Sequence, residues 1–166
     1  MTGPVALRVP TDADAEVWAE LFDDAEVMRY VGSGEVRDLD WYRAFVRRQQ
    51  ELADTTGLCL FALLVGDEVA GFTGIQPWPQ PWGPVGELEV GWRLGRRFWG
   101  SGYATAAAWE VLDRARQRGL TRVVALIHAG NGASLAVARK LGLTEEAVLQ
   151  APDGASVRQY GGTLTG

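Results

Sequence analysis

Apolar residues recur along this chain with two different periods, which alternate from segment to segment. Continuous or alternating apolar runs typical of strands cover 5–9, 58–65, 68–75, 87–94, 123–127, 143–149 and 156–164. Apolar residues at helical spacing cover 11–22, 25–30, 40–57, 104–119 and 131–141. The pattern predicts an α+β fold in which helices flank a mixed, mostly antiparallel central sheet of about seven strands.

Capping and turn residues set the expected ends of several elements. Thr11, followed by Asp14, resembles a capping box, and Asp40 is expected to cap the third helix, which Gly57 ends. The proline-rich segment 77–84 reads Pro-Trp-Pro-Gln-Pro-Trp-Gly-Pro. Because proline has no backbone N–H to donate, we expect this segment to be a rigid connection outside the sheet.

Length and composition indicate one compact domain over residues 1–166. The chain is 47% hydrophobic and carries a formal net charge of −5, so a nucleic-acid partner is not expected. It has neither an apolar run of 18 residues nor the start of a signal peptide, so no membrane association is expected. One cysteine, Cys59, excludes an internal disulfide, and no residues have metal-ligand spacing. We expect a metal-free cytoplasmic protein, as a monomer or a homodimer.

The junction between the strand 87–94 and the helix that follows carries the clearest chemical signal. It contains Arg97-x-x-Gly100-x-Gly102, directly before an apolar helical stripe. Backbone N–H groups of such a turn and the dipole of the helix N-terminus point at one spot, which favours an anion. Glycines let the backbone approach a phosphate without a Cβ in the way. The junction therefore predicts a pyrophosphate site.

Three phosphate-binding patterns compete for this turn. A Walker A loop needs a lysine after its last glycine, but the only lysine of the chain is Lys140. A dinucleotide fingerprint needs a third small residue where Thr105 stands. The third pattern, [QR]-x-x-G-x-[GA], matches without adjustment.

This last pattern resembles the coenzyme A loop of the Gcn5-related N-acetyltransferase (GNAT) superfamily. The strand Glu89-Val-Gly-Trp92 before the loop and Asn131-Gly-Ala-Ser134 after it strengthen the resemblance. They point to the branch that contains the ribosomal-protein N-terminal acetyltransferases of the RimJ and RimL type. The resemblance implies a sheet splayed between the fourth and fifth strands, with acetyl-CoA as acyl donor in the gap. The residues expected to bind it are Trp92, Leu94, Arg96, Arg97, Trp99, Gly100, Ser101, Gly102, Tyr103, Ala104, Thr105 and Asn131.

Two residues are candidates for proton transfer during acetyl transfer to an amine. Glu89 lies in the middle of a strand, where a carboxylate is costly to bury, so we expect it to face a wet cleft and to act as base. Many relatives place a tyrosine acid where this chain has Ala138, which leaves Ser134 or a water to protonate the thiolate. Asn131 and Ser134 also fit a plain helix cap, and His128 is expected to be structural.

The acceptor side is described less completely by the sequence. Glu87 shares a strand face with Glu89 and is expected to contact substrate, as are Tyr30, Trp78 and Trp82. The two tryptophans fit a wall of the acceptor pocket, a dimer contact or packing onto the protein's own core. The predicted function is direct acetyl transfer from acetyl-CoA to a primary amine. A protein N-terminal α-amine and a small-molecule amine both remain open, as does a non-catalytic acyl-CoA-binding module.

Overall fold

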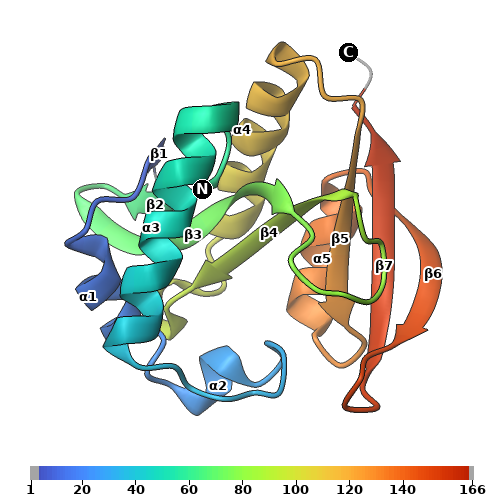
Figure 1. Cartoon of the computed structure of the whole chain (residues 1–166), viewed down its shortest axis with the longest axis horizontal. Coiled ribbons are helices and arrows are strands. Elements are labelled where there is room, and N and C mark those ends of the chain that lie inside the picture. Colours follow the sequence, from blue (N-terminus) through green and yellow to red (C-terminus); the bar gives the residue numbers. More distant parts are fainter. Residues whose placement is uncertain (1–3, 165–166) are drawn as a thin grey trace.

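A computed structural model describes residues 4–164, which form one seven-stranded sheet with helices on both faces (Figure 1). Along the chain the elements are β1 (Val5–Arg8), α1 (Asp14–Leu21), α2 (Ala25–Met28), α3 (Leu39–Thr56), β2 (Leu60–Val65), β3 (Glu68–Pro77), β4 (Leu88–Leu94), a 3₁₀ turn η1 (Arg96–Phe98), α4 (Tyr103–Gln117), β5 (Arg122–His128), α5 (Gly132–Lys140), β6 (Thr144–Gln150) and β7 (Ser156–Thr163). This architecture confirms the predicted α+β fold. None of the helices described is long and apolar enough to cross a bilayer.

The sheet has the strand order β1-β2-β3-β4-β5-β7-β6, and all neighbours are antiparallel except β4 and β5. The parallel pair is in register at a single position, Glu89 opposite Val124. Both strands run away from this point in the same direction without further pairing. The predicted splay between the fourth and fifth strands is therefore present, and Glu89 lies where the two strands diverge.

Two apolar clusters cover the two faces of the sheet. One cluster joins α4 and α5 to the sheet, and the other joins α1, α2 and α3 to the opposite face (Figure 1). Successive strand residues point to opposite faces. Val90 and Leu94 accordingly belong to the α4 and α5 side, whereas Glu89 and Arg93 point toward the side of α1, α2 and α3.

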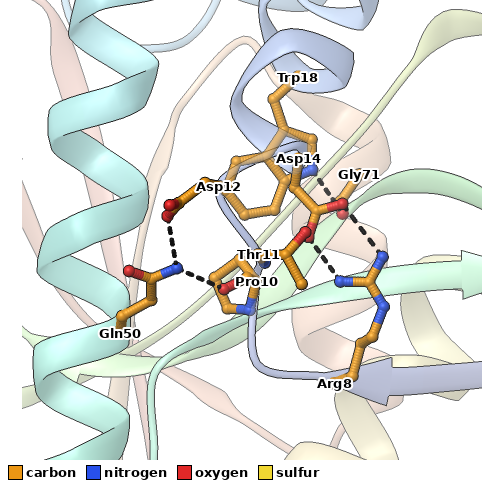
Figure 2. Close-up of polar contacts among 8 residues, drawn as sticks. All are labelled: Arg8, Pro10, Thr11, Asp12, Asp14, Trp18, Gln50 and Gly71. Carbon is orange, nitrogen blue, oxygen red and sulfur yellow. Dashed lines mark hydrogen bonds and ion pairs between the residues drawn. The ribbon is translucent and has the colours of Figure 1, made fainter.

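A polar cluster fixes the junction between β1 and α1 (Figure 2). The buried carboxylate of Asp14 accepts hydrogen bonds from the guanidinium of Arg8 and, at 2.8 Å, from the backbone N–H of Thr11. One bond of the predicted capping box is thus present, from the Thr11 N–H to the Asp14 carboxylate. The other bond is missing, because the Thr11 side chain does not cap the helix. Trp18 of α1 is fully buried and donates from its indole to the Gly71 carbonyl at 3.1 Å. These bonds hold α1 against β3.

Two predicted boundaries were wrong. Asp38, not Asp40, caps α3 by accepting the Trp41 N–H at 2.9 Å, while Asp40 pairs with an arginine one turn later. Both aspartates precede the apolar stripe, so spacing alone did not separate them. Pro77 was expected outside the sheet but ends β3. Pro77 pairs only with β4, because the pairing between β2 and β3 does not extend beyond Gly74. The N–H that proline lacks is therefore not needed for pairing with β2.

Candidate active site

The predicted anion site lies at the start of α4. Gly100 and Gly102 adopt left-handed backbone angles, with φ of 77° and 79°, which glycine adopts readily. Gly102 precedes the helix without a side-chain cap, and the first helical hydrogen bond runs from the Ala106 N–H to the Gly102 carbonyl. The amides of residues 103–105 therefore precede the helical ladder and are oriented out of the helix start. This arrangement suits a phosphate.

The two arginines predicted beside this turn have carboxylate partners. Arg96 binds Asp24 at the start of α2 and lowers the pKa of that carboxyl group. Arg97 pairs with Glu68 at 2.8 Å and lies over the Phe98 ring. Trp99 is 48% exposed, and its indole donates to the Leu94 carbonyl at 2.9 Å, at the end of β4. Backbone amides of the turn, with both arginines already paired, are thus the prominent donors of this site.

Trp92 and Ser134 meet across the gap between the diverging strands. The indole of Trp92, on β4, donates a hydrogen bond to the Ser134 hydroxyl oxygen at 3.1 Å. The side chain of Asn131 in turn accepts the backbone N–H of Ser134 at 3.2 Å and caps α5. The N-cap interpretation of Asn131 is therefore correct, and the same bond fixes the first turn of α5. Ser134 reaches the gap from the α5 side.

Glu89 reaches the gap from the opposite face of the sheet. Its side chain is half-buried, and burial raises the pKa of Glu89 to about 7. A hydrogen bond from the side chain of Gln76 and the charge of Arg93 both act against this rise and lower the pKa. A carboxyl group whose pKa is close to neutrality is suited to take a proton from an amine at physiological pH.

Arg93 is a feature of this face that the sequence analysis missed. Its guanidinium lies over the rings of Phe22 and Phe72, with centroid distances of 5.2 and 4.9 Å, and contacts the hydroxyl of Tyr42 at 3.5 Å. Its position four residues after Glu89 on one strand already placed both on the same face. The surrounding rings come from α1, α3 and β3, which no local motif connects to it.

Tyr30 and His128 form a contact near the open end of the gap. Their ring centroids are 4.9 Å apart, and Arg29 lies over the Tyr30 ring. The Nδ1 of His128 accepts the Gly130 N–H at 2.9 Å, so its imidazole is held in place. This bond agrees with the structural role expected for His128. The stack also places the predicted acceptor residue Tyr30 beside the end of β5.

The other predicted acceptor residues have partners within the protein. Glu87 forms an ion pair with Arg122 at 3.3 Å, just before the point where β4 and β5 diverge. Trp78 donates from its indole to the Trp82 carbonyl, and the two rings meet edge to face at 5.3 Å. An ideal Cβ on Gly83 would lie 3.7 Å from Leu149 of β6. The two tryptophans therefore pack against each other within the loop, and neither belongs to the two apolar clusters of the sheet.

Outside this arrangement, the described residues form no metal centre, but they do form a surface pocket away from the gap. Within residues 4–164, no three histidine, cysteine, aspartate or glutamate side chains gather as a metal ion would need. A surface pocket lined by Gly57, Arg114, Gln117 and Arg118 lies at the far end of α4 and shares no residue with the gap.

Comparison with known proteins agrees with this geometry. The model of the GNAT acetyltransferase domain family matches residues 5–144. The uncharacterized protein YkkB of Bacillus subtilis is 34% identical over 149 residues, which span 86% of this chain and 83% of YkkB. The structure of RimL, a ribosomal L7/L12 α-N-protein acetyltransferase in complex with coenzyme A, superposes with a TM-score of 0.80, at 19% identity, over 96% of this chain and 93% of RimL.

A further structural neighbour is Mycobacterium smegmatis RimJ, with a TM-score of 0.79 and 23% identity over 97% of this chain and 82% of RimJ. A sheet splayed beside β4, with a glycine turn between β4 and α4, agrees with the match to the GNAT class of acetyltransferases. The chain belongs to the GNAT acetyltransferase family. It is an enzyme of the acetyl-CoA-dependent acyltransferases, and acetyl-CoA is its acyl donor.

Proposed function

We propose that the chain, acting as one domain, transfers the acetyl group of acetyl-CoA directly to a primary amine, with Glu89 as base and Ser134 as acid. One observation carries the proposal: these two side chains approach the gap between β4 and β5 from opposite faces of the sheet. Glu89 does so where the strands diverge, with a pKa raised to about 7, and Ser134 does so through its bond to Trp92. An acetyl group held in the gap lies between them.

The reaction proceeds through a ternary complex without an acyl-enzyme. Glu89, directly or through one water, takes a proton from the ammonium form of the acceptor. The amine nitrogen then attacks the thioester carbonyl carbon, the new C–N bond forms and the C–S bond breaks. The thiolate of coenzyme A leaves and takes the hydroxyl proton of Ser134. The new amide nitrogen gives up its second proton to solvent, from which Ser134 regains its own, and Glu89 also returns its proton to solvent. The sole cysteine, Cys59, is buried with its pKa raised to about 12, which makes it a poor nucleophile.

The donor is held mainly by backbone groups in this proposal. The amides of residues 103–105 and the turn at Gly100 and Gly102 bind the pyrophosphate, with Arg96 and Arg97 adding positive charge nearby. Residues 90–94 of β4 have no strand partner on the β5 side and offer backbone groups to the pantetheine arm and the acetyl carbonyl. Trp92, Leu94, Trp99 and Asn131 line this path.

The acceptor that we favour is the N-terminal α-amine of a protein. RimL, which shares the fold, acts on such an amine in a ribosomal protein. Tyr30, Trp78 and Trp82 are the side chains that border the acceptor side in this proposal, with Glu87 at the narrow end of the gap. A small-molecule amine is the second candidate, because the half-buried Glu89 needs only one amine to approach it.

The test is acetyl transfer from radiolabelled acetyl-CoA to three sets of acceptors. The sets are peptides with free N-termini, the same peptides with blocked N-termini and a lysine, and small amines that include polyamines and amino acids. Transfer to the first set alone supports an N-terminal acetyltransferase, and transfer to the third set alone supports the second candidate. Acetyl-CoA binding without transfer to any set would replace the enzyme by an acyl-CoA-binding module.

A further inference from the structure

A chain of buried amide side chains leads from the backbone of β2 to Glu89. The Leu60 N–H donates to Gln49 Oε1 at 2.8 Å, and Gln49 Nε2 donates to Gln76 Oε1 at 3.0 Å. Gln76 lies directly opposite Glu89 in the β3–β4 register, and its side chain hydrogen bonds to the Glu89 carboxylate. These bonds therefore run from α3 along the same face of the sheet, over β3, to the proposed base on β4.

The direction of every bond in this chain follows from its first member. A backbone N–H can only donate, so the Gln49 atom that faces Leu60 must be the amide oxygen. The NH₂ group of Gln49 then faces Gln76, which must present its own oxygen. The NH₂ group of Gln76 remains, and it points at Glu89. Each amide orientation is thus imposed by the previous one and ends in an N–H donor aimed at the carboxylate.

Both glutamines are buried, with exposed fractions of 0% for Gln49 and 8% for Gln76. Burying an amide is costly unless its hydrogen bonds are made, and an apolar pair would fill the same space without that requirement. The Leu60 N–H needs only the oxygen of Gln49. Gln76 is not required for that bond, but it is the residue that extends the chain to Glu89.

We infer that Gln49 and Gln76 are positioning residues that hold an N–H donor on Glu89 and so keep its carboxylate available as a base. The inference rests on the proposed function for the role of Glu89, but not for the bonds themselves. A donated hydrogen bond favours the charged carboxylate over the neutral acid. Without it, burial would raise the Glu89 pKa further, and a smaller fraction of the enzyme would carry the base at neutral pH.

Other charged or titratable groups on this side of the sheet keep their own partners. Arg93 lies on the same strand and contacts Tyr42 of α3, Glu87 pairs with Arg122, and the Tyr30 ring contacts that of His128 of β5. Of these groups, Arg93 acts on Glu89, where its charge lowers the pKa together with Gln76. The hydrogen bonds of Gln49 go to Leu60 and Gln76, whereas Arg93 bonds to Tyr42, so replacing the glutamines tests the amide contribution apart from the charge of Arg93.

The test compares Gln76→Leu and Gln49→Met with a matched control, Gln50→Leu. Gln50 lies on the same helix, but its amide bonds to Pro10 and Asp12, at the β1–α1 junction (Figure 2). The first readout is the Glu89 carboxyl pKa, from ¹³C NMR of protein labelled at glutamate carboxyl groups, assigned with Glu89→Gln. We expect Gln76→Leu and Gln49→Met, called the relay variants because they interrupt the amide relay to Glu89, to raise this pKa by about one pH unit. The control should leave it unchanged.

Gln49→Met is the decisive variant, because the hydrogen bonds of Gln49 go to Leu60 and Gln76 rather than to Glu89, and because methionine keeps the length of the side chain. Should Gln76→Leu fail to fold, Gln49→Met still releases the orientation of the Gln76 amide and raises the pKa. An unchanged Glu89 pKa in the folded Gln49→Met protein overturns the inference, whatever the enzyme acetylates.

The second readout is the pH profile of acetyl transfer. Its acid limb should move upward with the NMR pKa in both relay variants and stay in place in Gln50→Leu. If the pKa moves but the limb does not, the relay stands and the base role of Glu89 fails. The two proposals are thereby tested separately.

Discussion

The indole N–H of Trp92 and the hydroxyl oxygen of Ser134 form a hydrogen bond of 3.1 Å across the gap that separates β4 from β5. An indole N–H can only donate, so Ser134 must accept this bond and its own proton points elsewhere. In the proposed reaction, that proton is the one given to the leaving thiolate. Trp92 therefore orients Ser134, in addition to its proposed place beside the donor.

This bond predicts that both partners affect chemistry more than donor binding. We expect Ser134→Ala to lower kcat by about tenfold to a hundredfold, because water can replace part of a general acid. Trp92→Phe keeps the ring but removes the N–H, and should cause a smaller loss, of about threefold to tenfold. Steady-state kinetics with acetyl-CoA would check this, with the exposed Ser156→Ala as control. Unchanged kcat in Ser134→Ala would assign the proton to water.

The raised pKa of Glu89, about 7, predicts the pH dependence of transfer. A base must be ionised to act, so kcat/KM should rise with pH below about 7 and lose this dependence above it. Glu89→Gln should lower the rate by about a hundredfold and remove this limb of the profile. Because the acceptor amine titrates identically in both proteins, the difference between the two profiles isolates Glu89. A limb that persists in Glu89→Gln would belong to another group.

The parts of the site that the sequence predicted share one property: they lie close together along the chain. Gly100 and Gly102 follow β4 closely, and the period of two along residues 87–91 placed Glu87 and Glu89 on one face. A fixed backbone geometry connects such residues, so spacing alone places them. The resemblance added the splay, which brings Trp92 to Ser134 over 42 residues of sequence.

The contacts that the sequence did not predict depend on the packing of distant elements. Gln49 and Gln76 are 27 residues apart, and their bond exists only because α3 lies against β3 at one particular height. Glu87 meets Arg122 over 35 residues, so a side chain expected to contact substrate has an internal partner. Local propensity does not specify such pairs, because many polar residues have equal access to a surface before the elements dock.

The pKa of Glu89 also predicts a gain in stability when the carboxylate is removed. Its pKa is about 7 in the folded chain, against 4.5 for an unperturbed glutamate. Between these values the folded state binds more protons than the unfolded state, so the free energy of unfolding falls as pH rises through this window. Glu89→Gln should therefore raise that free energy by about 2–3 kcal/mol at pH 8 and hardly change it at pH 4.

Urea denaturation at the two pH values would measure this gain, since the midpoint and slope give the free energy of unfolding. Glu68→Gln, on the exposed end of β3, serves as the control, because its carboxylate is largely solvated. A gain of equal size at pH 4 would show that the effect comes from packing of the amide. No gain at pH 8 would mean that the cleft solvates the carboxylate as well as water does.

Two matched glycines, one before and one after α4, allow the effect of backbone strain to be separated from the effect on anion binding. Gly100 and Gly119 flank opposite ends of the helix with φ of 77° and 81°, and an added Cβ would meet nothing within 4 Å at either position. Alanine at each should cost about 1 kcal/mol of stability, because both impose the same left-handed backbone on a residue with a Cβ. Only Gly100 lies beside the amides proposed to bind pyrophosphate.

Gly100→Ala should therefore weaken acetyl-CoA binding by about tenfold or more, while Gly119→Ala leaves it unchanged. The reason is geometric: a Cβ at Gly100 would fill space that is open in the structure and that the pyrophosphate occupies in the proposed site. Isothermal titration with acetyl-CoA would measure both affinities, and thermal unfolding without ligand would check that both variants lose the same stability. Affinities that stay at the unmodified value in both variants would place the pyrophosphate elsewhere. An equal loss of affinity in both variants would attribute the effect to destabilisation of α4.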